Sequence, residues 1–117
     1  MLNRFGHVEL IAFLADATNG INKVSIFTNL SETAKQTITW DSAVSVAGGT
    51  GDQDDTAYVS MSATVLGFTI PAGETVLSVR LYHDTVEWGY INFASSYYFP
   101  VEGTFSLTDI TITIGNV

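Results

Sequence analysis

Most of this chain after residue 20 consists of short stretches in which apolar and polar residues alternate, and this pattern constrains the fold most. The stretches are rich in β-branched and aromatic residues, which favour extended strands. Turn-forming residues separate them at intervals of roughly 8–12 residues, as in sandwiches and small barrels. We therefore expect an all-β fold, an antiparallel β-sandwich (jelly-roll or immunoglobulin-like) of about seven to eight strands. The expected strands cover residues 21–28, 35–41, 55–64, 66–70, 75–83, 86–93, 95–99 and 104–114.

The phase of the alternation predicts which side chains face the core. In residues 75–83, Leu77, Val79 and Leu81 share the phase expected to point inward, opposite to Val76, Ser78, Arg80 and Tyr82. In residues 104–114 the phase changes after Leu107. A one-residue slip near Thr108–Asp109 would restore it, so we expect a β-bulge there.

One segment before the strands has a helical pattern. In residues 6–18, Leu10, Phe13, Leu14 and Ala17 fall on one face, and Asn19–Gly20 is a typical helix stop. A short strand through Val8–Ala12 is the alternative. We expect one domain over residues 1–117, with an N-terminal arm or short helix at 1–20 and the sandwich at 21–117.

The charge of the chain excludes several partners. The 117 residues contain 4 Lys+Arg and 12 Asp+Glu, a formal net charge of −8 at pH 7. Four cations are too few to neutralise a nucleic-acid backbone or to form a polybasic patch on a membrane. We therefore expect that the chain binds neither nucleic acid nor a membrane. The chain has no Cys, which excludes disulfides and cysteine-based zinc sites.

A Gly-rich acidic loop at residues 46–55 is the candidate metal site. Asp52, Asp54 and Asp55 could supply the oxygen ligands that Ca²⁺ prefers. The loop lacks the frame of an EF-hand, and a solvated acidic loop is the interpretation we prefer. We expect neither a bound metal nor another cofactor.

No residue pattern indicates catalysis. The pair His83–Asp84 suggests a catalytic triad, but the G-x-S-x-G motif that would supply an activated serine is absent, and a strand-end His beside a turn Asp explains the pair. A glycosidase would need two carboxylates across a cleft, and the sequence does not place Glu87 with a second one. We therefore expect a protein that is not an enzyme.

The aromatic residues favour interaction surfaces. Trp40 and Trp88 share the phase of aliphatic neighbours and are expected in the core, whereas Tyr82, Tyr97 and Tyr98 are the candidates for an exposed, subunit-facing role. The aromatic faces could instead stack on sugar rings, which keeps a carbohydrate-binding module as the alternative. With only 14% charged residues, the surface suits packing against copies of the same chain.

Three motifs carry a resemblance to a known family. They are ITWDSA at Ile38–Ala43, IPAG at Ile70–Gly73 followed by Val76, Val79 and Leu81, and GTFSLT at Gly103–Thr108 followed by Ile112 and Ile114. Over residues 10–115 the chain resembles the small β-sandwich virion proteins of tailed bacteriophages, found among head-decoration, tail-fibre and minor-tail proteins. It departs from their pattern in a short stretch between Phe27 and Gln36 and in the acidic run at 52–55.

The resemblance implies a non-enzymatic structural protein of the virion, made in the host cytoplasm. It implies an exterior accessory subunit of head or tail that binds copies of itself and the major capsid or tail proteins. A host-surface glycan is a further candidate partner. The family supplies turn and core patterns and no catalytic residues.

Overall fold

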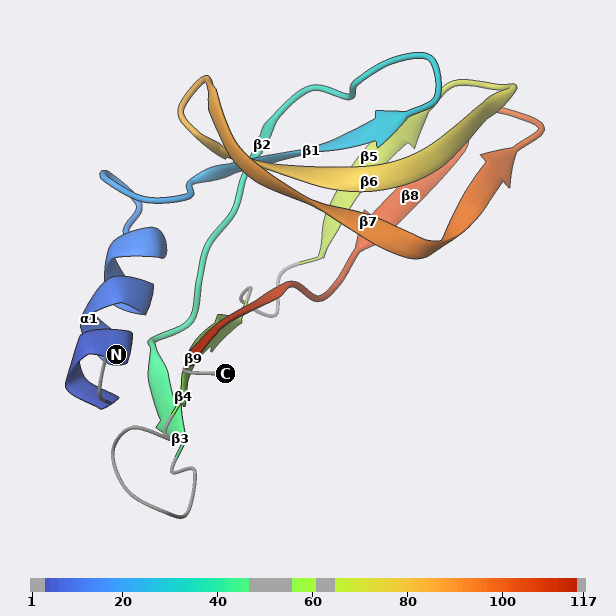
Figure 1. Cartoon of the computed structure of the whole chain (residues 1–117). Helices are drawn as coiled ribbons and strands as arrows, with labels where there is room; N and C mark the ends of the chain where they lie inside the picture. Colours follow the sequence, from blue (N-terminus) through green and yellow to red (C-terminus); the bar gives the residue numbers. More distant parts are fainter. Residues whose placement is uncertain (1–3, 47–55, 61–64, 116–117) are drawn as a thin grey trace.

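The computed structural model describes residues 4–46, 56–60 and 65–115 of the chain (Figure 1). In this part of the chain one helix precedes nine strands, and every strand pairing is antiparallel. An all-β chain with antiparallel sheets and one short N-terminal helix is therefore confirmed. The elements are α1 (Arg4–Leu14), β1 (Lys23–Thr28), β2 (Gln36–Thr37), β3 (Val44–Val46), β4 (Thr56–Ser60), β5 (Leu66–Ile70), β6 (Glu74–His83), β7 (Val86–Phe99), β8 (Gly103–Leu107) and β9 (Thr111–Gly115).

The larger part of the molecule is built from two sheets. A four-stranded sheet has the order β2-β1-β6-β7, and a two-stranded ribbon pairs β5 with β8. The ribbon lies against the sheet (Figure 1), and the main core fills the space between them. Burying each large aliphatic or aromatic side chain contributes about 1.5–3 kcal/mol. The core includes Val24, Ile26, Phe68, Ile70, Val76, Val79, Leu81 and Leu107.

The smaller part combines the helix with the third sheet. This sheet has the order β3-β4-β9, and α1 packs against it with Ile11 fully buried (Figure 1). Trp40 and Ile112 contact both this small core and the main core. The chain extends over 51 × 29 × 23 Å with a radius of gyration of 16.0 Å, whereas a compact chain of this length has about 13 Å. The molecule is thus elongated.

The helix is confirmed, but its buried face differs from the prediction. His7 and Ile11 are fully buried, whereas Leu10 and Phe13 are 41% and 51% exposed. The sheet covers the side of α1 that carries His7 and Ile11. The position of the sheet, and not the number of apolar residues, therefore decides which face of the helix is buried.

The helix also ends earlier than expected, at Leu14. Asp16 then accepts hydrogen bonds of 2.8 Å from the N–H groups of Thr18 and Asn19. Gly20 does not adopt a positive φ. It is required because a Cβ there would lie 2.3 Å from the Phe13 carbonyl oxygen.

The predicted phase of β6 is wrong in its first half. Val76 and Ser78 are buried and Leu77 is exposed, whereas Val79 and Leu81 are buried as expected. The register with β7 shifts between Val76 and Ser78. A bulge at this point rotates the strand, so that residues in opposite phases face the same core.

The last predicted strand is two strands in different sheets. Its first half, β8, pairs with β5, and its second half, β9, pairs with β4. In place of a β-bulge, the chain crosses from one part of the molecule to the other at Thr108–Ile110. The phase change reflects this crossing, since Leu107 and Ile110 are buried on either side of it.

The other predicted strands differ mainly in length. The two strands predicted at residues 86–93 and 95–99 form the single strand β7. Of the strand predicted at residues 35–41, only the two residues of β2 form a strand, although Ile38 is buried as its phase predicts. Of residues 55–64, 56–60 form β4, and 61–64 lie outside the described residues. The predicted turn after Ile70 is present, with Gly73 at φ 83°.

Candidate interaction surface

Strand β7 carries the largest run of exposed apolar side chains in the described chain. It is 14 residues long, forms an outer edge of its sheet, and has no buried residue. An edge strand presents unpaired N–H and C=O groups along its free side. Its exposed apolar side chains are Val86, Trp88, Tyr90, Ile91, Tyr97 and Tyr98.

This strand is electrically almost neutral although the chain is acidic. Its single charged residue, Glu87, accepts a hydrogen bond of 3.1 Å from Arg80 on β6. The Arg80 guanidinium also lies 4.1 Å from the Phe27 ring centroid and 4.6 Å from that of Tyr90. Such exposed cation–π contacts contribute about 0.5–1 kcal/mol each. The surface around β7 therefore lacks the charge repulsion expected over the rest of the chain.

Trp88 is exposed and does not belong to the core, contrary to the prediction. The register between β6 and β7 shifts at this point, because Leu81 pairs with Gly89 and Tyr82 pairs with Glu87. Trp88 is therefore the extra residue of a bulge, a feature that often redirects a side chain. Its ring stacks near His83 at 5.1 Å and near Phe13 at 6.2 Å between centroids.

An apolar groove of about 500 Å³ lies beside Trp88, where the two parts of the molecule meet. Its walls come from the end of α1, from β6 and β7, and from β9. No charged residue lines it. Its volume falls within the range of about 300–1,000 Å³ that is typical of ligand sites. The lining residues are Leu14, Ile21, Leu81, Trp88, Gly89, Ile91, Thr111, Ile112 and Thr113.

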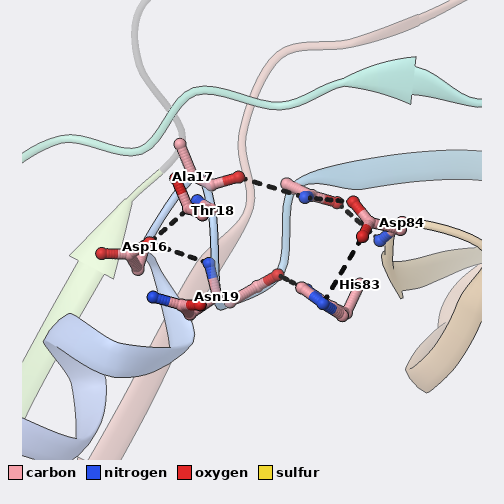
Figure 2. Close-up of polar contacts among 8 residues, drawn as sticks. Asp16, Ala17, Thr18, Asn19, His83 and Asp84 are labelled. Carbon is pink, nitrogen blue, oxygen red and sulfur yellow. Dashed lines mark hydrogen bonds and ion pairs between the residues drawn. The ribbon is translucent and has the colours of Figure 1, made fainter.

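A polar cluster fixes the turn between β6 and β7 to the segment after the helix (Figure 2). The Asn22 side-chain amide donates to Asp84 Oδ1 at 2.9 Å, and the Asp84 backbone N–H donates to Asn22 Oδ1 at 2.8 Å. This reciprocal pair holds Asp84 at a φ of 51°, a conformation that non-glycine residues adopt rarely.

His83 belongs to the same cluster, and its contacts differ from those of a catalytic triad. Its Nδ1 lies 2.8 Å from the Gly20 carbonyl oxygen, which can only accept, so Nδ1 carries the proton. In a triad that proton would point to the aspartate, but Asp84 Oδ2 lies 3.6 Å from the other nitrogen, Nε2. The arrangement holds the turn in place.

The three tyrosines predicted to face a subunit separate into two groups. Tyr97 and Tyr98 are exposed, and the Tyr97 ring packs 5.6 Å from that of Phe105. Tyr82 differs from the prediction, since it is 6% exposed and its hydroxyl donates a short hydrogen bond to Glu32. Burial and the neighbouring Glu32 raise the pKa of Tyr82. The phase of Tyr82 in β6 predicted the correct face of the sheet, but the segment that contains Glu32 covers this face.

Another carboxylate, Glu74, has a structural position at the start of β6. It is buried and accepts hydrogen bonds of 2.5 Å from the hydroxyls of Ser31 and Thr28. These two donors lower the pKa of Glu74. The sequence did not indicate a structural role for this residue. Glu74 falls in the phase that was predicted to point outward, so the alternation gave no signal for its burial.

The remaining predicted sites give no binding geometry. The calcium candidates Asp52, Asp54 and Asp55 lie outside the described residues. Among residues that the structure describes, no three His, Cys, Asp or Glu side chains gather as a metal site would require. In the same part of the chain, no helix has the length and apolar character needed to cross a membrane.

Comparison with known proteins gives no relative. No family model, no curated protein and no solved structure matches this chain.

Proposed function

We propose that this chain is a non-enzymatic structural subunit that assembles with copies of itself. The observation that carries the proposal is the surface of β7, where six large apolar side chains are exposed and the single acid is paired with Arg80. Exposed apolar side chains that gather along one edge strand are typical of interaction sites, and interfaces are enriched in tyrosine and tryptophan.

The particle that we propose is the virion of a tailed bacteriophage, with this chain as an exterior accessory subunit on the head or tail. This step rests on the resemblance of the three sequence motifs. It also agrees with the chemistry of the chain, because a subunit without cysteine keeps its fold in any redox environment. An acidic module is repelled by packaged nucleic acid and stays on the outside.

We further propose that the larger part of the molecule is a β-sandwich related to jelly-roll folds. The packing of the β5-β8 ribbon over the four-stranded sheet, with the main core between them, supports this topology.

Sedimentation velocity over a wide range of concentrations tests the assembly. We expect oligomers that dissociate on dilution, and the double substitution Tyr90→Ser with Ile91→Ser, at two exposed apolar positions of β7, should weaken association about tenfold or more. Leu30→Ser is the matched control, because Leu30 is an exposed apolar residue away from β7. A wild-type chain that stays monomeric at every concentration would overturn the proposal.

Quantitative mass spectrometry of purified phage particles tests the location. The expected result is a fixed number of copies per particle, large for a head or tail-tube position and small for a tip or neck. Particles without the chain would overturn the virion assignment and leave self-assembly to be judged by sedimentation.

Carbohydrate binding is the second candidate, and the exposed Trp88 at the rim of the apolar groove favours it. Such rings stack on the apolar faces of sugars. A glycan array should then show binding that Trp88→Ala removes. An array without signal would exclude this alternative.

A further inference from the structure

Gly89 has no role in the isolated chain that requires a glycine. A Cβ at this position would meet no atom within 4 Å, and its φ is not in the positive range. A glycine inside a strand costs about 0.5–1 kcal/mol relative to alanine. Such a glycine often marks a place where another backbone or a ligand approaches closely.

The surroundings of Gly89 indicate what approaches. Gly89 and Ile91 both line the apolar groove, and Tyr90 between them points to the other face, where it contacts Arg80. The ladder with β6 is regular from Gly89 to Asn92, between the bulge at Trp88 and the irregular stretch at 93–96. A regular edge segment of this kind accepts another strand, because its free N–H and C=O groups match those of an extended backbone.

Resting on the proposed self-assembly, we infer that residues 89–91 of β7, within this regular segment, pair antiparallel with the same residues of a second copy around a two-fold axis at Tyr90. In this register Tyr90 lies opposite Tyr90 of the second copy. Ile91 of each copy lies opposite Gly89 of the other and fills the space where a side chain is missing. A two-fold interface is self-complementary, so each copy supplies both the protruding residue and the notch.

The distribution of charge favours a second copy at this place. Two chains of net charge −8 repel each other over most of their surfaces. At residues 88–92 there is no charged side chain, and the nearest pair, Arg80 with Glu87, is neutral together. Added salt screens the remaining repulsion, so association should strengthen as the ionic strength rises.

A substitution that fills the notch tests the register. Gly89→Val should fold as the wild type does, because the space is open in the single chain, and should raise the dissociation constant at least tenfold by blocking Ile91 of the second copy. Ala94→Leu adds the same number of carbon atoms, three, to the same strand outside the regular segment and should change nothing. Adding Ile91→Gly to Gly89→Val exchanges the protruding residue and the notch and should restore most of the association.

Single cysteines in this cysteine-free chain test the symmetry. Tyr90→Cys should form a disulfide-linked dimer under mild oxidation, because its Cβ lies opposite its own copy, whereas Tyr98→Cys should not. If Gly89→Val associates like the wild type, or only Tyr98→Cys cross-links, this pairing is wrong while self-assembly through β7 stands. If the wild-type chain is monomeric, both proposals fail.

Discussion

Strands β6 and β7 lie side by side, are both rich in apolar residues, and have opposite environments. Most of the β6 side chains are buried, because β1 pairs on one side of this strand, β7 pairs on the other, and the β5-β8 ribbon covers its inner face. None of the β7 residues is buried, because β7 is the last strand of the sheet. Position in the sheet, and not composition, decides whether an apolar strand stabilises the fold or is available for another molecule.

The largest expected difference is between two aliphatic side chains on these strands. Leu81→Ala removes a buried residue and should lower the free energy of unfolding by about 2–5 kcal/mol. Ile91→Ala on β7 should cost no more than about 1.5 kcal/mol, since Ile91 is 41% exposed. Urea denaturation of the dilute chain measures both, and equal losses would show that β7 is as deeply packed as β6.

Replacing two glycines, Gly20 and Gly89, by alanine should give the next largest difference in stability. Gly20→Ala places a Cβ 2.3 Å from a backbone oxygen and should destabilise the chain by about 1–3 kcal/mol through overpacking. Gly89→Ala meets no atom and should leave thermal stability unchanged or raise it by about 0.5–1 kcal/mol. Calorimetry of the two variants checks this, and a destabilising Gly89→Ala would show that the isolated chain needs this glycine.

Removing the hydrogen bonds that hold the end of β6 should lower the free energy of unfolding by a somewhat smaller amount. Asn22→Ala removes the reciprocal pair with Asp84 and a hydrogen bond of 3.1 Å to the Ala17 carbonyl. The expected loss is about 1–2 kcal/mol. Hydrogen exchange should show faster opening of the turn at His83–Asp84. Unchanged protection there would mean that the turn keeps its conformation without Asn22.

The smallest effect concerns two glutamates, Glu74 on β6 and Glu87 on β7. The hydroxyls of Ser31 and Thr28 hold the pKa of Glu74 below its usual 4.5, so its contribution to stability is complete above pH 4.5 and is lost as the pH falls through the lowered value. Glu74→Gln should therefore flatten the decrease in melting temperature below pH 4.5. Glu87→Gln makes the same change in net charge and is the control. An unaltered acid profile in Glu74→Gln would contradict the role of these hydrogen bonds.

The sequence predicted the elements of this fold better than their arrangement. Alternation located β1, β5 and β6, and the turn after Ile70 was correctly identified by Pro and Gly. The prediction from alternation failed where the chain leaves one sheet and enters another. At Thr108–Ile110 such a crossing produces the same change of phase as a β-bulge. The buried side of α1 was missed because its apolar residues extend around the helix, and only the neighbouring sheet distinguishes them.

The candidate surface could be predicted only in part. Tyr97 and Tyr98 are exposed as their positions suggested, but Tyr82 is covered by the segment that carries Glu32, which is 50 residues earlier in the sequence. Trp88 shares its phase with Val86 and Tyr90, which predicted a core position. All three are exposed on an edge strand, and the bulge at Trp88 breaks their common phase, so that Trp88 lines the groove whereas Tyr90 lies on the other face beside Arg80.

The amino-acid sequence by itself determined that the chain forms strands, where its turns lie, and that it is acidic with little charge, because these properties depend on local conformational preference and on composition. Only the tertiary structure decided which strands lie inside and which lie at an edge, that Gly20 is required and Gly89 is not, and that Arg80 neutralises the one acid of β7. These outcomes depend on which distant segments become neighbours, and side-chain burial, close backbone approach and ion pairing are properties of neighbours rather than of single residues.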